Sequence, residues 1–338
     1  MRATVLHAPG DIRVETLPDP DLRDDTDAIV RVVASCVCGS DLWPYRGADH
    51  AGEPRQIGHE FVGVVEQVGS AVAGVSPGDF VIAPFTYSDN TCALCLKGVH
   101  TSCVNGGGYV GCQCELVRVP FADGTLVTVP GEVDEAMLPH LLTLSDVFPT
   151  GHHAAVSAGV TEGSTVAVVG DGAVGLSAVL AAKRLGAATV IAMSRHEPRQ
   201  EVARAFGADH IVATRGSEGA AEVSEILGGI GADAVLECVG TNDSFKQAFR
   251  TVRPGGTVGY VGLPHGVEPN IPVMFYTNRN LAGGVAPVRA YLEDLLPDVL
   301  SGAVTPGDVF DLTLPLDQVA KGYQAMDERT AIKAFLRV

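Results

Sequence analysis

Three residues that stand far apart in the chain carry side chains of the kinds that bind zinc. Cys38 follows a valine-rich segment, His59 comes shortly before another, and Asp146 precedes the second half of the chain. A thiolate, an imidazole and a carboxylate suit Zn²⁺, and three protein ligands with a fourth position left open are typical of a catalytic site that polarises a substrate oxygen. Spacing alone does not establish such a site, because a single cysteine at a strand end is also typical of a buried core.

A glycine-rich turn in the middle of the chain indicates a bound nucleotide. The sequence GDGAVG ends the apolar run Thr165–Gly170 and opens a stretch with apolar residues at helical spacing. Gly170 permits a tight bend, Gly172 lets the backbone approach a pyrophosphate, and Gly175 lets helix and strand pack closely. The alternative is a turn of an α/β domain that holds no ligand. The residues assigned to the phosphates are Gly170, Gly172, Ala173, Val174 and Gly175.

The end of the next predicted strand selects between NAD(H) and NADP(H). An acidic residue there usually accepts hydrogen bonds from the adenosine 2′-hydroxyl. Here the strand Thr189–Met193 is followed by Ser194, Arg195 and His196, with Arg199 close behind. The strand end lacks the usual carboxylate, and the two arginines and the histidine attract a 2′-phosphate, which predicts NADP(H) rather than NAD(H). The alternative is that both arginines are solvated charges at the start of a helix.

The secondary-structure elements that must position these residues follow two different sequence patterns, one in each half of the chain. At 338 residues, of which 46% are apolar, the chain has enough core material for two domains. Residues 1–145 contain short, valine-rich segments bounded by Gly, Pro and Asp, which predicts mainly β structure. Residues 160–285 alternate apolar runs with helical segments, which predicts a parallel, doubly wound sheet. The predicted strands of that sheet are Thr165–Gly170, Thr189–Met193, His210–Ala213, Ala232–Val239, Thr257–Gly262 and Leu281–Ala286.

The remaining segments complete this expectation. The chain is expected to begin with two strands joined by a turn at Pro9-Gly10. After residue 287 the pattern loosens, and a final strand at Ile332–Val338 closes the chain. Further strands are predicted at Ala28–Ser35, Phe61–Val68, Asp79–Ala83 and Glu115–Val119. Helices are predicted at residues 173–186, 197–206, 217–228 and 242–252.

The charge of the chain excludes several classes of partner. The formal net charge is −17, which disfavours binding to nucleic acids and to anionic membrane surfaces. No window reaches about 20 uninterrupted apolar residues, so no membrane-spanning helix is expected. The N-terminus lacks a basic region followed by an apolar run, so we expect no signal peptide and a cytoplasmic protein. In a reducing cytosol the eight cysteines are metal ligands, nucleophiles or core residues rather than disulfides.

Over essentially its full length the chain resembles the zinc-dependent medium-chain alcohol dehydrogenases. The resemblance implies a Rossmann-type α/β domain at residues 149–287. It also implies a mainly β, GroES-like catalytic domain at residues 1–148 and 288–338, with a zinc lobe near 85–115. The implied activity is hydride transfer between NADP(H) and an alcohol, aldehyde or ketone. The matching motifs are Cys38-Gly-Ser-Asp41, Gly58-His-Glu60, Gly78-Asp-Phe-Val81, the cysteine-rich lobe, Gly170–Gly175, Glu237-Cys-Val-Gly240 and Gly255-Gly256.

The resemblance also implies roles for individual residues. In this family the Cys and His of the first two motifs bind the catalytic zinc, and one branch, the tetrameric secondary-alcohol enzymes, uses Asp as the third ligand. This chain would then use Cys38, His59 and Asp146, with Glu60 as a fourth or exchanging ligand. Asp41 would accept a hydrogen bond near the metal. The further coenzyme residues implied by the resemblance are Thr150, on the nicotinamide side, and Val239 and Gly240.

The family's structural-zinc lobe has four cysteines, and this chain matches three of them. Asp89 stands at the first position and is followed by Cys92, Cys95 and Cys103. Three thiolates and a carboxylate can hold Zn²⁺ tetrahedrally, although oxygen is the less typical structural ligand. A second, structural zinc is therefore expected, and the alternative is a metal-free lobe with reduced cysteines.

Three residues near the predicted zinc site have roles in the reaction or in substrate choice. The hydroxyl of Ser40 can pass a proton between the substrate oxygen and the coenzyme ribose. In many family members a histidine continues this relay at the position of Trp43, so we expect protons to leave through Ser40 and the ribose directly to solvent. Trp43 and Phe85 are expected to form an apolar wall for aldehydes, ketones or secondary alcohols rather than polyols. Packing beneath the site is the alternative role of Trp43.

Two other functions are compatible with this scaffold. One is a zinc-free quinone or enone reductase, although such relatives usually lack the set of Cys38, His59 and Asp146. The other is a non-catalytic, NADPH-binding regulatory protein, which loss of Ser40 or of the metal set would favour. The resemblance further implies a homodimer or homotetramer, often formed through the edge of the nucleotide-binding sheet, here near Leu281–Ala286.

Overall fold

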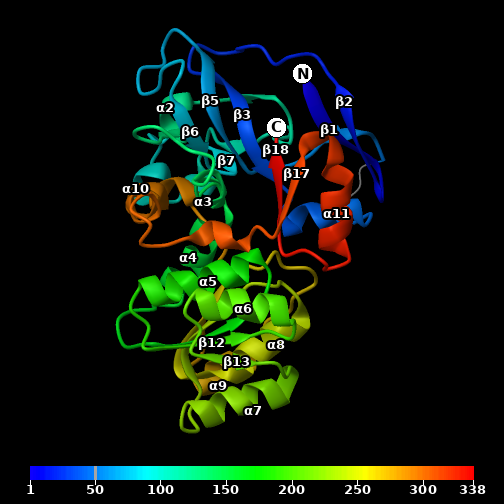
Figure 1. The fold of residues 1–338 in the computed structure, drawn as a ribbon. Helices are drawn as coiled ribbons and strands as arrows, with labels where there is room; N and C mark the ends of the chain where they lie inside the picture. The colour runs from blue at the N-terminus through cyan, green and yellow to red at the C-terminus, as the bar shows by residue number, and fades with distance from the viewer. Residues whose placement is uncertain (49–51) are drawn as a thin grey trace. The chain divides into compact units, whose positions relative to one another are not determined.

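The computed structural model describes residues 1–48 and 52–338, which divide into two compact units. The first unit comprises Met1–Asp146 and Pro287–Val338, and the second comprises Val147–Ala286. Within the first unit, the red C-terminal strand lies beside blue strands from the beginning of the chain (Figure 1). The first unit is therefore completed by a segment that returns to it from the far end of the sequence.

A seven-stranded sheet forms the main layer of the first unit. The strands of this unit are β1 (Arg2–Ala8), β2 (Asp11–Thr16), β3 (Ala28–Cys36), β4 (Arg55–Gln56), β5 (Phe61–Val68), β6 (Phe80–Ala83), β7 (Thr86–Tyr87), β8 (Gly107–Gly108), β9 (Leu116–Val119), β10 (Val127–Thr128), β17 (Leu312–Pro315) and β18 (Ala334–Arg337). The sheet has the order β10-β6-β5-β3-β18-β17, and β9 also pairs with β3. β3 is central because its residues are nearly all apolar or small, so both of its faces are buried. The sheet β2-β1-β4 and the pair β7-β8 are separate.

The helices of the first unit are short near the N-terminus and longer in the returning segment. They are α1 (Leu42–Tyr45), α2 (Ala122–Thr125), α3 (Leu138–Thr143), α10 (Val288–Leu300) and α11 (Val319–Asp327). The loose pattern after residue 287 therefore contains two helices and an additional strand that the sequence pattern did not predict. Pro297 inside α10 is normally a sign that a helix ends. The helix continues past Pro297 because leucine and valine side chains on one face are buried.

A six-stranded parallel sheet forms the second unit. Its strands are β11 (Thr165–Val169), β12 (Thr189–Met193), β13 (His210–Val212), β14 (Ala232–Glu237), β15 (Val252–Tyr260) and β16 (Asn280–Gly283). Their order is β13-β12-β11-β14-β15-β16, and every pairing is parallel. This is the doubly wound order of a Rossmann domain, which reverses between β11 and β14. The predicted α/β fold with a Rossmann-type sheet is thereby confirmed, although β15 begins five residues earlier than predicted.

Helices cover both faces of this parallel sheet. They are α4 (Val147–Ser157), α5 (Ala173–Arg184), α6 (Glu197–Ala205), α7 (Gly216–Ile226), α8 (Asn242–Thr251) and α9 (Ile271–Thr277). α4 packs against α5, and α7 packs against α8. Figure 1 shows α5 and α7 on opposite sides of β12 and β13. The apolar strands are buried between these layers, whereas α9 has no buried residue. Across the described residues, no helix is long and apolar enough to cross a membrane.

Candidate active site

The pairing of β3 with β5 brings three candidate zinc ligands together. The two strands are antiparallel, with Ser35 opposite Phe61. The residues that follow β3 therefore lie beside the residues that precede β5, and Cys38 comes close to His59 and Glu60. Ser35 Oγ donates a hydrogen bond of 2.7 Å to the backbone oxygen of Glu60, which holds the two strand ends together.

Asp146 reaches the same place from the turn that follows α3. The backbone amide of Phe85, just beyond β6, donates a 3.0 Å hydrogen bond to the residue before Asp146 and ties this turn to the sheet. Asp146 Oδ2 lies 3.3 Å from His59 Nε2 and 3.9 Å from Cys38 Sγ. Four side chains offer donor atoms within 4.8 Å of one another, namely Cys38, His59, Glu60 and Asp146. The structure thus gathers these four sequence-predicted candidates into one cluster.

Asp41 holds two of these candidate ligands in place. Its Oδ1 lies 3.4 Å from His59 Nδ1, and its Oδ2 accepts a 3.0 Å hydrogen bond from the backbone amide of Cys38. A carboxylate at the second nitrogen of a ligating histidine fixes the orientation of the ring. Gln113 donates to the same Oδ2 at 3.4 Å. A side chain at Gly58, where φ is +94°, would collide with Gln113, so this approach requires glycine.

A buried ion pair lies directly beside the cluster. Lys333 Nζ donates to Glu60 Oε1 at 2.7 Å and to the backbone oxygen of Val37 at 3.2 Å, and both charged side chains are only 1% exposed. The register of β18 on β3, with Phe335 opposite Cys36, places the lysine there. Glu60 Oε2 is buried and has no hydrogen-bond partner among the described residues. One oxygen of Glu60 is therefore held by the lysine, and the other can face a cation.

The charges of this cluster fit a divalent metal ion. Lys333 balances Glu60, which leaves the carboxylate of Asp146 and the thiol of Cys38 to meet a bound cation; burial raises the pKa of that thiol, so it would lose its proton when the metal binds. Burial lowers the pKa of His59, but the negative charges of Asp41 and Cys38 outweigh it and raise that pKa well above its usual value. The raised pKa of His59 shows that the surrounding groups favour a positive charge at this place, which a bound cation would supply. Sulfur, nitrogen and oxygen donors together suit Zn²⁺.

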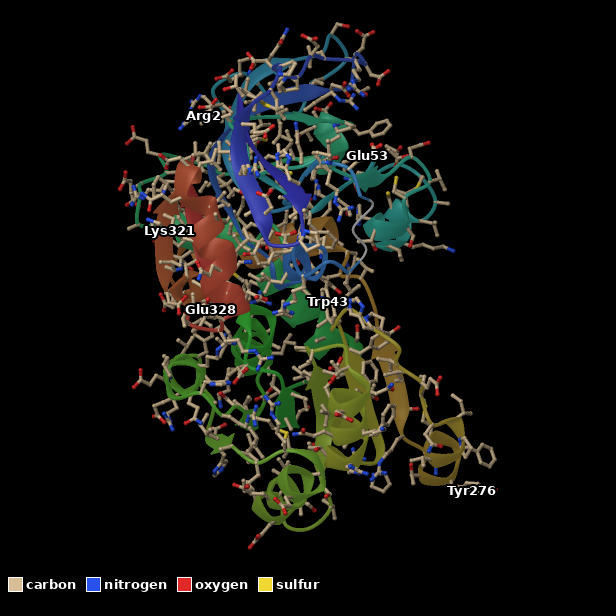
Figure 2. The ribbon with its side chains drawn as sticks, turned by 90° about the vertical axis from the view of Figure 1, so that its right-hand side faces the viewer. Arg2, Trp43, Glu53, Tyr276, Lys321 and Glu328 are labelled. Carbon is tan, nitrogen blue, oxygen red and sulfur yellow. The ribbon has the colours of Figure 1, made fainter. Side chains whose placement is uncertain are left out.

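The three residues predicted to act beside the zinc lie on two segments. Ser40 is half-buried in the single 3-10 turn that follows Cys38, and its hydroxyl makes no hydrogen bond within the described ranges. Trp43 lies in α1, is half-buried and is marked in Figure 2. The ring of Phe85 meets the ring of His59 edge-on, with centroids 6.2 Å apart. Phe85 therefore borders the cluster directly.

A second cluster whose side chains could bind a metal ion lies in the cysteine-rich lobe. Cys92 Sγ lies 3.5 Å from Cys95 Sγ and 3.9 Å from Cys103 Sγ, and Asp89 completes the group. Asp89 accepts hydrogen bonds from two backbone amides at 2.9 Å and from Asn105 at 2.7 Å, which lower its pKa. Backbone hydrogen bonds lower the pKa of Cys92 to about 7, whereas burial raises that of Cys95 to about 12. Three sulfurs and one ionised carboxylate fit a tetrahedral zinc.

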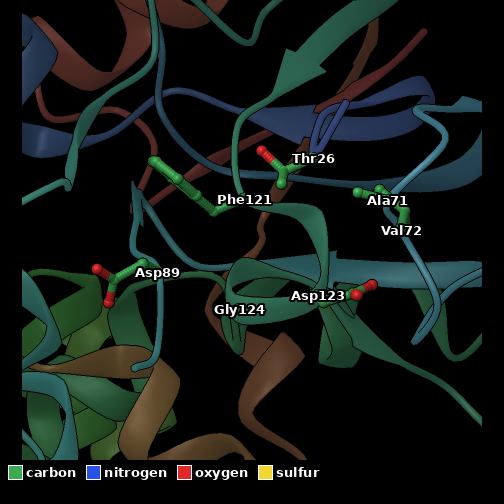
Figure 3. A pocket seen from close by; sticks show the side chains of 7 residues that line it. All are labelled: Thr26, Ala71, Val72, Asp89, Phe121, Asp123 and Gly124. Carbon is green, nitrogen blue, oxygen red and sulfur yellow. The ribbon is translucent and has the colours of Figure 1, made fainter. Parts of the chain in front are cut away.

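Asp89 also lines a small cavity of about 100 Å³ (Figure 3). Thr26, Phe121 and Asp123 line the same cavity. The carboxylate of Asp123 is already used, because it accepts hydrogen bonds from two backbone amides at 3.0 and 2.8 Å. Sites for small molecules typically enclose about 300–1,000 Å³. This cavity is therefore too small to be the coenzyme site.

The glycine-rich turn in the second unit has a backbone that suits a phosphate. Gly170 has φ +121°, which other residues rarely adopt. A side chain on Gly175 would clash with the carbonyl oxygen of Gly170, so α5 packs directly against the turn. Gly172 is the N-cap of α5 and has open space beside it. Its neighbours Ala173 and Val174 form the first turn of α5, whose amides carry partial positive charge.

The residues after β12 make contacts that the sequence pattern did not predict. Ser194 is buried, and its Oγ donates to Asp171 Oδ2 at 2.9 Å. Arg199 Nη1 donates to the backbone oxygen of Asp171 at 3.0 Å and lies 3.6 Å from its Oδ1. Arg195 is exposed, and His196 is half-buried with an Nε2 that has no hydrogen-bond partner in the described part of the chain. Two of the four residues assigned to a 2′-phosphate are therefore engaged by the glycine-rich turn.

The remaining predicted coenzyme residues lie at the end of β14 and in α4. The amides of Val239 and Gly240 donate to Glu237 Oε1 at 3.0 and 2.8 Å. Glu237 is fully buried, and burial raises its pKa. This carboxylate therefore shapes the loop at the carboxyl edge of the sheet. Thr150 is half-buried in the first turn of α4.

Comparisons with known proteins identify the family from both units. Residues 24–131 match the alcohol dehydrogenase GroES-like domain, and residues 173–298 match the zinc-binding dehydrogenases. Zinc-type alcohol dehydrogenase B of Aspergillus flavus is 34% identical over 100% of this chain and 81% of its own length. The chain belongs to the zinc-dependent medium-chain alcohol dehydrogenase family. The predicted resemblance and the predicted GroES-like domain are confirmed by these matches.

Solved structures of alcohol dehydrogenases have the same fold. Alcohol dehydrogenase TADH from Thermus sp. ATN1 is 32% identical, with a TM-score of 0.93 and full coverage of both chains. A zinc-binding dehydrogenase target from Sinorhizobium meliloti 1021, solved bound to NADP, is 27% identical with a TM-score of 0.83, over 100% of this chain and 99% of that one. As an alcohol dehydrogenase family member, this protein is an oxidoreductase of a family that uses zinc and a nicotinamide coenzyme.

Sequence reasoning gave no role to four residues around the sites of this alcohol dehydrogenase family member. They are Gln113, Asp171, Glu237 and Lys333. One signal was available for Lys333, because it is a charged residue inside the apolar segment AIKAFL. Glu237 likewise ends the apolar strand β14. The other two lie in loops, where a polar residue gives no sign of its partner.

The ion pair of Lys333 with Glu60 provides a test of the packing around the catalytic cluster. Replacing Lys333 with methionine is expected to lower the free energy of unfolding by about 3–5 kcal/mol, because it leaves a buried carboxylate without its partner. Urea unfolding of the zinc-loaded protein measures this loss. The double variant Lys333→Met with Glu60→Gln should regain most of it. A loss below about 1 kcal/mol in the single variant would contradict the argument.

Proposed function

We propose that the protein is an NADP(H)-preferring, zinc-dependent alcohol dehydrogenase or carbonyl reductase. It transfers a hydride between the coenzyme and an alcohol, an aldehyde or a ketone. The observation that carries this proposal is the cluster of Cys38, His59 and Asp146, with Glu60 beside them, whose donor atoms lie within 4.8 Å of one another. A thiolate, an imidazole and a carboxylate leave room for one more ligand, as catalytic zinc sites do.

The residues of the first unit would divide the work of the reaction. Zinc supplies a Lewis acid that polarises a carbonyl oxygen or lowers the pKa of an alcohol. Asp41 orients the ring of His59, and Lys333 holds one carboxylate oxygen of Glu60, so that only the other could reach a metal. Ser40 Oγ would give the product oxygen its proton during reduction and take that proton back during oxidation. The aromatic ring of Phe85, at 6.2 Å from that of His59, favours apolar aldehydes and ketones over polyols.

The second unit supports a dinucleotide with a 2′-phosphate. The open backbone at Gly172 and the first turn of α5 suit a pyrophosphate. Ser194 and not a carboxylate directly follows β12, Glu197 further on pairs with Arg204, and the exposed Arg195 and the half-buried His196 can both donate to a phosphate. A relative of the same fold is bound to NADP. Arg195 and His196 therefore support NADP(H) over NAD(H) as the preferred coenzyme of this protein.

A panel assay tests this proposal against its alternatives. NADPH oxidation is measured with aldehydes, ketones and quinones, with and without a zinc chelator, and a paired series uses NADH. Turnover of aldehydes or ketones that the chelator abolishes would support the proposal. Chelator-resistant turnover of quinones or enones would favour the zinc-free reductase. Binding of NADPH without turnover of any substrate would favour the regulatory protein, and higher kcat/KM with NADH would overturn the coenzyme preference.

The second cluster is proposed to hold a structural zinc, and the compartment is proposed to be the cytoplasm. All eight cysteines are free thiols in the structure. Thiolates that bind zinc must stay reduced, and the cytosol maintains that condition. Zinc analysis of the purified protein should therefore find about two ions per chain, one for each cluster.

We also propose that the protein forms a homodimer or homotetramer through the edge of the nucleotide-binding sheet. β16 is one of the two edge strands of this sheet, and α9 just before it carries Phe275 and Tyr276, whose side chains are 75% and 82% exposed. Figure 2 shows Tyr276 projecting away from the ribbon. An unpaired edge beside exposed aromatic side chains is typical of a contact with a second copy.

Charged substitutions on α9 test this assembly. The double variant Phe275→Glu with Tyr276→Glu should shift the protein from oligomer towards monomer, because carboxylates would be buried in the contact. Sedimentation velocity at micromolar protein measures the shift. Ile230→Glu is the matched control, since Ile230 is 67% exposed in the loop after α7. An unchanged sedimentation coefficient in the double variant would place the contact elsewhere.

A further inference from the structure

Asp171, the second residue of the glycine-rich turn, makes contacts that no other residue of the turn makes. Its Oδ2 accepts a 2.9 Å hydrogen bond from Ser194 Oγ, and its Oδ1 lies 3.6 Å from Arg199 Nη1. The same guanidinium donates to the backbone oxygen of Asp171 at 3.0 Å. The side chains of Arg199 and Asp171 are 12% and 16% exposed, so the pair is largely shielded from solvent.

The parallel register of β11 and β12 explains this arrangement. Val169, the last residue of β11, lies opposite Met193, the last residue of β12. Asp171 and Ser194 therefore leave the sheet at the same edge and side by side. In dinucleotide-binding sheets the carboxylate that receives the adenosine 2′-hydroxyl follows the second strand. Here the second strand lacks that carboxylate, and the turn after the first strand supplies one at the same edge.

We propose that Asp171 limits the preference of this protein for NADP(H) over NAD(H), an inference that rests on the proposed function. Its carboxylate compensates the charge of Arg199 and keeps that guanidinium on the turn. It also repels a 2′-phosphate and can accept a hydrogen bond from a 2′-hydroxyl. All three effects act in the same direction and moderate the preference for NADP(H) that Arg195 and His196 provide.

Replacing Asp171 with asparagine tests the proposal with little change in shape. The amide oxygen can still accept the hydrogen bond from Ser194, but the negative charge is removed. Dissociation constants for NADPH and NADH are measured by the change in coenzyme fluorescence on binding, without any substrate. The ratio Kd(NADH)/Kd(NADPH) should rise about tenfold, since a charge-assisted hydrogen bond to phosphate is gained.

Two further variants make the test decisive. Arg199→Gln leaves the charge of Asp171 uncompensated and should lower the same ratio about tenfold. Asp233→Asn is the matched control, because Asp233 accepts hydrogen bonds from Thr165 and Arg253 at the opposite end of β11. The ratio Kd(NADH)/Kd(NADPH) of this control variant should stay within about twofold of the ratio of the wild-type protein.

The outcomes separate this inference from the proposed function. If the unchanged protein binds neither dinucleotide, the proposed function itself fails. If it binds a dinucleotide but the ratio changes less than twofold in both Asp171→Asn and Arg199→Gln, only the role of Asp171 is overturned. A change equal to that of Asp233→Asn would overturn it as well, because that change would reflect the loss of any carboxylate in the sheet.

Discussion

Replacing Asp146 with asparagine is expected to remove the catalytic zinc and to lower kcat/KM for carbonyl reduction by about 10³. The carboxylate lies 3.3 Å from His59 Nε2 and 3.9 Å from Cys38 Sγ. The amide has the same shape, but it is neutral and binds a dication far less strongly. Its NH₂ group would also face the nitrogen donor of His59. Zinc content should fall from about two ions per chain to about one, because the lobe is untouched.

Two controls distinguish the loss of a ligand from general damage. Asp11→Asn changes an exposed carboxylate that pairs with Arg13, so zinc content and turnover should be unchanged. Cys103→Ser should remove the lobe zinc and leave one zinc ion at the catalytic cluster. An Asp146→Asn protein that kept two zinc ions and more than a tenth of its turnover would refute the assignment of this ligand.

Replacing Ser40 with alanine is expected to slow hydride transfer by about 10²–10⁴, the usual range for loss of a general acid or base. Ser40 follows Cys38 by two residues, and its hydroxyl makes no hydrogen bond to any described residue. Trp43 stands where many relatives carry a relay histidine, and an indole N–H can only donate. Ser40 is thus the one hydroxyl of this turn that could pass a proton to the product oxygen.

Single-turnover measurements with NADPH isolate the step in which Ser40 is proposed to act. The rate of coenzyme oxidation should fall while the dissociation constant for NADPH stays the same. Ser40→Thr keeps a hydroxyl at the same position and should restore most of the rate. Near-normal turnover in Ser40→Ala would exclude the proton-transfer role of Ser40. Equal rates in Ser40→Ala and Ser40→Thr would exclude it as well.

The conformation of the glycine-rich turn could be predicted from the sequence because its geometry is local. Gly170 must adopt a positive φ, and Gly175 must lie against the turn without a side chain; both requirements follow from residues close together in the chain. The same holds for the alternation of strands and helices that predicts the parallel sheet. The helix α10 escaped prediction because Pro297 interrupts its pattern while buried leucines keep it helical.

The candidate zinc ligands could be named from the sequence, but the sequence did not show that they come together. Cys38, His59 and Asp146 meet because β3 pairs with β5 and because Phe85 ties the turn before Asp146 to the sheet. Strand pairing over such separations depends on the whole core rather than on local preference. For the same reason no pattern in the sequence pairs Lys333 with Glu60.

Residue types along this chain were enough to indicate its candidate donor atoms, its glycine-rich turn and a parallel, doubly wound sheet, but not the order of the strands in that sheet. Only the tertiary structure decided which of these side chains contact one another. Ser194 and Arg199 contact Asp171 rather than open solvent, and Glu60 pairs with a lysine from the far end of the chain. Local sequence limits which conformations a segment can adopt. Contacts between distant segments arise only when burial of the core brings their strands into register, and these contacts determine the charge at each site.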